Sequence, residues 1–230
     1  MLTHVRAIAF DLDNTLWDVE PVLARAEARL GAWLAQHCPR IAQRMTPEAL
    51  RRERERLALA EPHRAHDLTY LRIATLAAQA RAHGYPESVA EEAFAVFIAA
   101  RNEVEVFPDV APGLARLGAR YALASLSNGN ADLERIGLQR VFRVSLNARQ
   151  IGAAKPALRC FEALSATLAL PPAAIAYVGD DPHLDVRAAR AAGMRAVWMN
   201  RRGAAWPAGL DPADLVVRDC AQLAAAFGAH

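Results

Sequence analysis

The chain has 230 residues, of which 53% are hydrophobic and 23% charged, so it is large enough to bury a core and is neither disordered nor fibrous. Its 27 basic and 25 acidic residues leave a formal net charge of +2, which is too near neutrality to indicate a protein that binds nucleic acid or anionic membranes through its overall charge. The longest apolar run, residues 93–100, is much shorter than the roughly 20 residues of a spanning helix. We therefore expect no membrane segment, and no cleavable signal peptide either.

The cysteine and lysine contents narrow the possibilities further. Cys38, Cys160 and Cys220 are odd in number and far apart. This pattern predicts reduced, apolar side chains in a cytoplasmic protein, not a disulfide framework or a metal site. Lys155 is the only lysine, and every other one of the 27 basic residues is arginine. Such a chain either keeps one lysine by chance or needs a compact ammonium where a planar guanidinium does not fit.

The first predicted element is a buried strand at residues 5–10, an apolar run that stops at the polar segment 11–15. From 18 to 105, by contrast, Ala, Leu, Arg and Glu recur with helical periodicity, and no β-branched run interrupts them. The expected helices, separated by proline and glycine breaks, cover residues 20–37, 47–59, 67–83 and 87–101.

The rest of the chain alternates between strand and helix. Apolar runs predict strands at 121–126, 143–146, 175–179, 195–199 and 215–217. Helical periodicity between them predicts helices at 110–118, 131–138, 157–169 and 184–192. This alternation indicates the α/β class, with a Rossmann-like parallel sheet covered on both faces. The α/β part then comprises residues 1–17 and 106–230, and residues 18–105 form an inserted helical subdomain.

Polar residues cluster where the predicted strands end, at the edge where open α/β sheets bind ligands. They are Asp11, Asp13 and Thr15 after the first strand, Ser127 and Asn128 after the second, Lys155 before the fourth, and Asp180, Asp181 and Asp185 after it. Several carboxylates at one place need a cation, and oxygen-only ligands favour Mg²⁺. Hydroxyl, amide and ammonium donors suit a tetrahedral anion such as phosphate. A carboxylate beside them can attack phosphorus, and a second one can act as acid and base.

These segments resemble the four motifs of the haloacid dehalogenase superfamily, in order and over essentially the whole chain. Residues 10–16 (FDLDNTL) are similar to motif I, 126–128 (LSN) to motif II, 155–156 (KP) to motif III and 179–185 (GDDPHLD) to motif IV. The resemblance implies a sheet order of 5-4-1-2-3. It also implies that residues 18–105 form the helical C1 cap of that superfamily.

The resemblance also implies a role for each core residue. Asp11 resembles the nucleophile, and Asp13 the general acid/base whose backbone carbonyl also reaches Mg²⁺. Asp180 resembles the remaining protein ligand of the metal, which makes Asp11, Asp13 and Asp180 the expected metal set.

The other motif residues are expected to hold the substrate or support the site. Phosphate would be bound by Ser127, Asn128, Lys155 and Thr15, the last of which also holds the motif I loop. Asp185 and Asp181 would act through water or orient Lys155. Asp181 is alternatively only the acid in the first turn of the following helix.

A narrower resemblance concerns the substrate. The matching strings are residues 66–72, 127–131 with 137–138, and 178–181 with 185–186. They are similar to the bacterial FMN phosphatases, which also dephosphorylate 5-amino-6-(5-phosphoribitylamino)uracil in riboflavin synthesis. The implied substrate is a small phosphorylated metabolite, and the expected protein is a monomer or weak homodimer. Candidate substrate contacts in the helical block are His66, Tyr70 and Arg72.

Some residues have a plainer reading. Asp67 is expected to cap its helix. Residues 51–56 interleave arginine with glutamate, which indicates a solvated helix face and no nucleic-acid site. Trp17 is either a packing residue at the hinge of the helical block or a wall of the active-site entrance.

Other functions of the same fold can be weighed from the sequence. A 2-haloacid dehalogenase has no use for an acid at position 13 or for Mg²⁺, and a phosphonate hydrolase of the known type needs a cap lysine, which residues 18–105 lack. A sugar-phosphate mutase shares the two aspartates and stays open. A non-enzymatic module that binds a phosphorylated metabolite is expected to have lost Asp11 or Asp13, and both are present.

Overall fold

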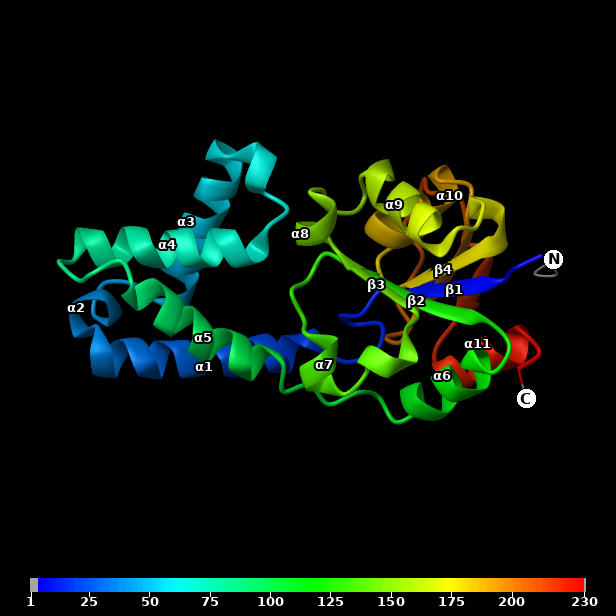
Figure 1. Cartoon of the computed structure of the whole chain (residues 1–230), viewed down its shortest axis with the longest axis horizontal. Coiled ribbons are helices and arrows are strands. Elements are labelled where there is room, and N and C mark those ends of the chain that lie inside the picture. The colour runs from blue at the N-terminus through cyan, green and yellow to red at the C-terminus, as the bar shows by residue number, and fades with distance from the viewer. Residues whose placement is uncertain (1–3, 230) are drawn as a thin grey trace. The chain divides into compact units, whose positions relative to one another are not determined.

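The computed structural model describes residues 4–229 (Figure 1). One of the two parts of the protein contains a six-stranded parallel sheet. The strands are β1 (Ala7–Phe10), β2 (Ala122–Ser127), β3 (Val144–Asn147), β4 (Ile175–Gly179), β5 (Arg195–Met199) and β6 (Leu215–Val217). Their order is β3-β2-β1-β4-β5-β6, and every neighbouring pair is parallel. The predicted fold class and the order 5-4-1-2-3 are confirmed, and β6 is added beside β5.

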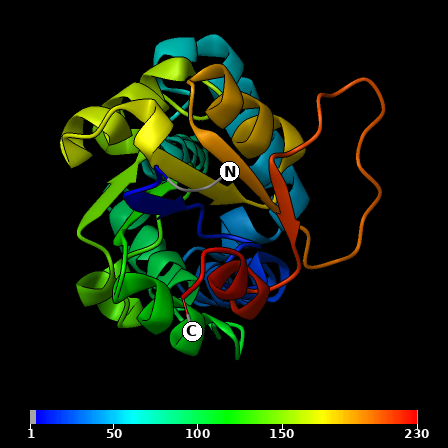
Figure 2. The same cartoon turned by 90° about the vertical axis from the view of Figure 1, so that its right-hand side faces the viewer.

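Helices cover both faces of this sheet, which explains why β1 and β4 are buried along their whole length. On one face, α9 (Leu158–Leu168) and α10 (Ala188–Ala191) pack over the central strands, with α8 (Ala148–Ile151) nearby. On the other face, α6 (Val110–Gly118) lies beside α11 (Cys220–Ala226). Figure 2 shows the long loop between β5 and β6, drawn in orange, that extends away from the sheet.

The other part of the protein, inserted after β1, is all-helical. It consists of α1 (Val19–His37), α2 (Pro39–Ala42), α3 (Pro47–Ala60), a 3₁₀ turn (Pro62–Arg64), α4 (Leu68–Ala82) and α5 (Val89–Arg101). Helix α5 packs against both α1 and α4, and α3 packs against α4, around a separate apolar core that includes Leu30, Leu76 and Phe97. Among the described residues, no helix combines the length and the apolar character needed to cross a bilayer.

The described residues divide into two compact units. One comprises residues 4–18, 105–129 and 136–229, and the other comprises residues 19–104 and 130–135. We call them the sheet unit and the helical unit. Residues 130–135, which the sequence analysis assigns to the α/β part, group with the helices for a physical reason. The Asp132 N–H donates to the Asn102 side chain at 2.7 Å, and the Asn130 amide donates to Thr69 Oγ1 at 3.2 Å.

Several elements differ from their predicted form. The helix expected at 131–138 is only α7 (Leu133–Ile136), because Gly137 adopts a left-handed φ of 83° and ends it. The helix expected at 184–192 is a π-helical segment (Pro182–Arg187) that continues into α10. Three short helices, α2, α8 and α11, are additional to the prediction. The last of them begins where the Asp219 side chain accepts a hydrogen bond from Gln222 N.

Candidate active site

The carboxyl ends of β1, β2 and β4 bring the predicted site residues of the sheet unit together. Phe10, the last residue of β1, is in register with Val178 on β4 and Ser125 on β2. Asp11 and Asp180 therefore leave adjacent strands at the same edge of the sheet. Because β1 and β4 are buried along their whole length, the backbone from which these two side chains extend is held in place.

Lys155 lies at the centre of the cluster and is almost completely buried. Its Nζ donates to Asp11 Oδ1 at 2.7 Å, to Asp185 Oδ1 at 2.6 Å and to Tyr177 Oη at 2.9 Å. An ammonium has three hydrogens, and these three acceptors use all of them. Asp185 thus has the contact with Lys155 that the family resemblance implies. Tyr177, on β4, is a member of the cluster that sequence reasoning missed, because a tyrosine within an apolar run looks like an ordinary core residue.

Asn128 ties the loop after β2 to the backbone of Lys155. Its side-chain Oδ1 accepts from Lys155 N at 2.7 Å, and its Nδ2 donates to Lys155 O at 3.0 Å. The side-chain amide is therefore occupied in holding the lysine loop, whereas the sequence analysis expected Asn128 to bind phosphate. Ser127 Oγ accepts from Gly129 N at 3.0 Å, and a hydroxyl that accepts in this way can also donate its own hydrogen.

The motif I loop carries Asp13 and Thr15. Trp17 Nε1 donates to Asp13 Oδ1 at 2.8 Å, and Trp17 is fully buried. Thr15 is also fully buried; within residues 4–229, its hydroxyl oxygen has no hydrogen-bond partner. The Thr15 carbonyl accepts from Arg201 Nε at 2.7 Å. Arg201 also forms a bidentate ion pair with Asp109, in which Nη1–Oδ1 and Nη2–Oδ2 are both 3.0 Å apart. Arg201 is a second supporting residue that the sequence analysis missed, since 186 residues separate it from Thr15.

Two residues after β4 are placed by their backbone surroundings. The Asp180 carbonyl accepts from Trp198 Nε1 at 2.8 Å. Asp181 caps the π-helical segment, because its Oδ1 accepts from His183 N at 2.7 Å and from Leu184 N at 2.8 Å. Of the two interpretations that the sequence leaves open for Asp181, its hydrogen bonds favour the structural one, although Asp181 caps the segment instead of lying in its first turn.

Gly179 ends β4 directly against Asp185. A Cβ built at this glycine would overlap the carboxyl group of Asp185. The buried Asp185 side chain, whose Oδ2 accepts from Asp181 N at 3.0 Å, therefore needs glycine at the end of the strand.

The electrostatics of the cluster show a shortage of positive charge. Burial raises the pKa of Asp11 well above its ordinary range; Lys155 opposes this shift and Asp185 adds to it. Burial, with Asp185 and Asp181, raises the pKa of Asp180 to about 7. Burial disfavours the charged form of Lys155, but Asp11 and Asp185 outweigh it, so the pKa of the ammonium is raised and it stays charged. One ammonium thus faces more carboxylates than it can neutralise.

These carboxylates fit a hard divalent cation. Oxygen atoms of Asp11, Asp180 and Asp185 lie within 4.8 Å of one another, and oxygen-only donors suit Mg²⁺. Both oxygens of Asp185 already accept hydrogen bonds. Asp11 and Asp180 are therefore the better side-chain ligands, with Asp185 as the counter-charge of Lys155. The carboxylate of Asp13, the third expected ligand, accepts a hydrogen bond from Trp17. Asp13 would therefore bind the metal through its backbone carbonyl, as the resemblance implies.

The substrate candidates of the helical unit are placed differently from one another. Asp67 caps α4, as predicted, and its Oδ1 accepts from Tyr70 N at 2.9 Å. The Tyr70 hydroxyl donates to Glu61 at 2.8 Å, and the guanidinium of Arg64 lies over the Tyr70 ring in a cation–π contact.

Arg72 is buried over the Phe97 ring and lies 2.9 Å from Glu27, and burial lowers its pKa to about 10. The contacts of Arg72 and Tyr70 lie within their own unit and favour packing over substrate contact. The third candidate, His66, is half-buried.

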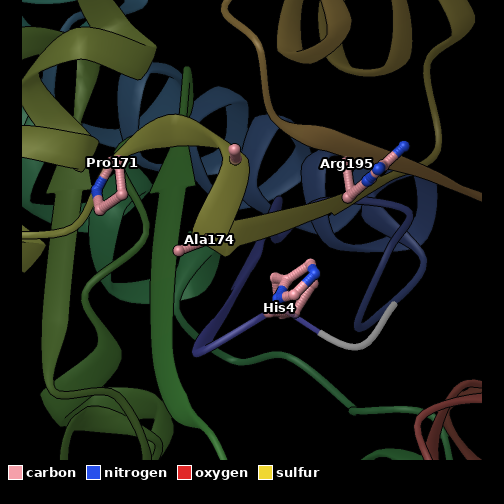
Figure 3. A pocket seen from close by; sticks show the side chains of 6 residues that line it. His4, Pro171, Ala174 and Arg195 are labelled. Carbon is pink, nitrogen blue, oxygen red and sulfur yellow. The ribbon is translucent and has the colours of Figure 1, made fainter. Parts of the chain in front are cut away.

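A cavity at the opposite edge of the sheet does not belong to this site. It measures about 260 Å³ and is lined by residues next to the amino ends of β1, β4 and β5, among them His4, Pro171, Ala174 and Arg195 (Figure 3). None of the predicted catalytic residues lines it. The cavity is therefore separate from the cluster at the carboxyl edge.

Known proteins are similar to this chain in sequence and in fold. The model of the haloacid dehalogenase-like hydrolase family matches residues 5–193. The 5-amino-6-(5-phospho-D-ribitylamino)uracil phosphatase YigB of Escherichia coli is 32% identical over 205 residues, which are 86% of this chain and 84% of that protein. A phosphoserine phosphatase of Thermus thermophilus is 39% identical over 126 residues, 52% of this chain and 50% of that protein.

Solved structures give the same assignment at the level of the fold. The crystal structure of a 2-haloacid dehalogenase from Pseudomonas syringae has a TM-score of 0.92 and 35% identity, and covers 97% of this chain and 98% of that one. Phosphatases and a dehalogenase thus both have sequences related to this one. With the four motifs assembled at one sheet edge, these matches show that the chain belongs to the haloacid dehalogenase-like hydrolase family.

Proposed function

We propose that this enzyme is a Mg²⁺-dependent phosphatase that hydrolyses small phosphate monoesters through a phosphoryl group carried on Asp11. The observation that carries the proposal is the placement of Lys155 Nζ 2.7 Å from Asp11 Oδ1 in a cluster that lacks positive charge. Because the cluster already lacks positive charge, we expect a negatively charged phosphate ester to bind there only together with a cation. The oxygen-only donor set supports Mg²⁺ in that role.

In the first half of the reaction, a carboxylate oxygen of Asp11 attacks the phosphorus atom. The new O–P bond forms as the P–O bond to the leaving alkoxide breaks, and the Asp13 carboxyl gives its proton to that alkoxide. Lys155 stabilises negative charge on the phosphoryl group, and Asp185 and Tyr177 hold its ammonium in place. Mg²⁺ held by Asp11 and Asp180 would neutralise phosphoryl oxygens and orient the ester.

The second half regenerates the enzyme. A water molecule attacks the phosphoryl group, Asp13 removes its proton, and the O–P bond to Asp11 breaks to release inorganic phosphate. The Ser127 hydroxyl, which can also donate its own hydrogen, is the side-chain donor placed at the end of β2 for a phosphoryl oxygen. We assign Asn128 to holding the Lys155 loop, with its backbone N–H as the group available to phosphate.

The proposed substrate class is a phosphorylated flavin precursor or FMN. The match to YigB over 86% of the chain and the string at residues 66–72 support this class. We propose that the helical unit is the cap that selects the substrate, with His66 as its first candidate contact. The three cysteines are free and buried, which supports the expected reducing cytoplasm.

A second candidate function is dehalogenation, because a 2-haloacid dehalogenase is 35% identical over nearly the whole chain. The observation against it is Asp13. A halide leaves without a proton, so a carboxylate held by Trp17 two residues after the nucleophile has no task in that reaction.

One experiment separates the two. The purified protein is incubated with Mg²⁺ and a panel of phosphate esters that includes FMN, the ribitylaminouracil phosphate and sugar phosphates, and phosphate release is measured with and without EDTA. A parallel arm measures chloride released from 2-chloropropionate.

We expect Mg²⁺-dependent phosphate release that Asp11→Asn abolishes while circular dichroism stays unchanged. Release strongest with the flavin precursors supports the proposed substrate, and release spread over sugar phosphates keeps the phosphatase but removes the flavin assignment. Chloride release without phosphate release would establish the dehalogenase. A burst that needs a bisphosphate activator would indicate a mutase, and no reaction in any arm would leave a binding module.

A further inference from the structure

The indole of Trp17 donates to the carboxylate that the proposed reaction uses as acid and base. Its Nε1 lies 2.8 Å from Asp13 Oδ1, and the side chain is fully buried. We infer that Trp17 is a positioning residue that holds Asp13 Oδ1 and thereby commits the other oxygen, Oδ2, to proton transfer. This inference rests on the proposed phosphatase function.

The backbone around Trp17 shows that this contact is built into the loop. Asp13 and Trp17 form a parallel bridge, and Trp17 also forms an antiparallel bridge with Val106. Asn14, with a left-handed φ of 59°, donates its N–H to Trp17 O at 2.7 Å. The Leu16 carbonyl accepts from Phe107 N at 3.0 Å. The loop from 12 to 17 is thus closed on itself and paired with the returning chain, so the indole has little freedom to leave Asp13.

The chemistry of the indole decides what it does to the carboxyl. An indole N–H donates and cannot accept, so the oxygen that it holds cannot be the one that carries a proton toward Trp17. Asp13 Oδ1 stays an acceptor whether or not the group is protonated. This hydrogen bond therefore favours the protonated form of Asp13 that carries its proton on Oδ2, and it restricts rotation of the carboxyl group. Proton delivery to the leaving oxygen gains from such fixed geometry because general acid catalysis needs hydrogen-bond distance.

Packing alone is the competing explanation, because Trp17 is among the largest fully buried side chains of the protein. The two roles predict different dependence on the leaving group. A p-nitrophenolate leaves without a proton, whereas an alkoxide needs one. Loss of a packing residue lowers both rates alike; loss of acid positioning lowers mainly the rate with the alkyl ester.

The test compares wild-type protein with Trp17→Phe, which keeps a buried aromatic ring and removes the N–H. We measure kcat and KM for p-nitrophenyl phosphate and for the best alkyl phosphate of the panel. We compare kcat/KM, because it depends on the first half of the reaction, in which the leaving group departs, and not on the later hydrolysis step that both esters share. We expect kcat/KM with the alkyl ester to fall about tenfold more than kcat/KM with p-nitrophenyl phosphate, a part of the roughly 10²- to 10⁴-fold that a general acid supplies. Trp33→Phe, in the helical unit, is the matched control, and its ratio of the two rates is expected to equal that of wild type.

A second replacement covers the case in which the smaller ring unfolds the loop. Site-specific incorporation of 3-benzothienylalanine at position 17 keeps the bicyclic shape and replaces the N–H by sulfur. It is expected to reproduce the selective loss of the alkyl-ester rate. In an Asp13→Asn background the Trp17→Phe change should no longer alter the ratio, because the group that it positions is gone.

The outcomes distinguish this inference from the function on which it rests. If wild-type protein releases no phosphate from any ester, the proposed function fails before Trp17 is tested. If wild type is active and both replacements lower the two rates equally, or neither rate changes, Trp17 is a packing residue and the phosphatase stands. A selective loss with both replacements establishes the positioning role.

Discussion

Lys155 Nζ lies 2.7 Å from Asp11 Oδ1, although 144 residues separate the two in the chain. The contact is the meeting point of two loops, one after β1 and one held by Asn128. Asp185 and Tyr177 complete the surroundings of the ammonium, so its position is fixed from three directions. A phosphoryl oxygen that approaches Lys155 must therefore share a hydrogen with one of these acceptors.

Lys155→Arg tests whether the site needs a compact ammonium. The guanidinium is planar and larger, and it cannot point its donors at Asp11, Asp185 and Tyr177 at once. We expect kcat/KM to fall by about 10²-fold or more, the scale of losing one preorganised charge-stabilising group. Arg159→Lys, an exchange of the same two residue types at an exposed position, is expected to leave the rate unchanged. A Lys155→Arg protein with wild-type kcat/KM would contradict the assigned role.

Tyr177→Phe removes a hydroxyl that accepts from Lys155 and donates to Leu126 O at 2.8 Å. The loss leaves both groups buried without this partner, so we expect a fall of about 1–3 kcal/mol in the free energy of unfolding and a lower kcat. Urea unfolding and steady-state kinetics measure the two effects.

Tyr121→Phe is the control for that variant, because the Tyr121 hydroxyl also donates to a backbone carbonyl, that of Phe227, at 2.9 Å. It should cost stability without changing kcat. Equal kinetic effects of the two substitutions would mean that Tyr177 does not act through Lys155.

Asp180 makes the stability of the metal-free protein depend on pH. Its pKa is about 7 in the folded protein against a usual 3.8, so the folded state retains a proton that the unfolded chain has already lost. The stabilisation from this proton is complete below pH 3.8 and is lost as the pH rises through about 7. With EDTA present, we expect Tm to fall between pH 5 and pH 8, and Asp180→Asn to flatten this dependence.

Added Mg²⁺ should have the opposite trend, because a carboxylate ligand must be ionised to bind. The rise in Tm caused by Mg²⁺ is expected to be larger at pH 8 than at pH 5. A rise that is the same at both pH values, or larger at pH 5, would show that Asp180 is not a metal ligand.

Glu27→Gln tests the assignment of Arg72 to packing in the helical unit. Glu27 faces the buried Arg72 and the half-buried Arg54, at 2.9 and 3.3 Å, and the amide would leave both guanidinium groups without this counter-charge. We expect about 3–5 kcal/mol lower stability, by analogy with broken buried ion pairs. The order of preference among phosphate esters should stay the same. A changed order with unchanged stability would restore Arg72 as a substrate contact.

The sequence predicts those parts of the site that depend on local pattern. An apolar run followed by Asp11 and Asp13 places both at the end of a strand, and the parallel sheet then brings Asp180 beside them. The partners of these residues are different, because they depend on which side chains meet in space. Tyr177 sits in an apolar run, and nothing in that run indicates that its hydroxyl reaches Lys155, 22 residues away.

The same limit applies to Arg72 and to the short helices. In the sequence, Arg72 is a candidate substrate contact, and only the fold shows that Glu27, on another helix, lies 2.9 Å from it. Helix α11 has a detectable signal, Asp219 before a run of apolar residues, but seven residues are too few for periodicity to be clear. The end of α7 at Gly137 depends on a left-handed backbone angle, which glycine permits but does not require.

The close approach of Gly179 to Asp185 has a consequence for how such an enzyme can diverge or be redesigned. Gly179 has no side chain and takes no part in the chemistry. Any side chain at this position would displace Asp185, the counter-charge of Lys155. A mutational library that varies the residues around the reacting atoms can change the substrate and keep the reaction. A library that varies this silent glycine would lose the reaction while every catalytic residue is still present.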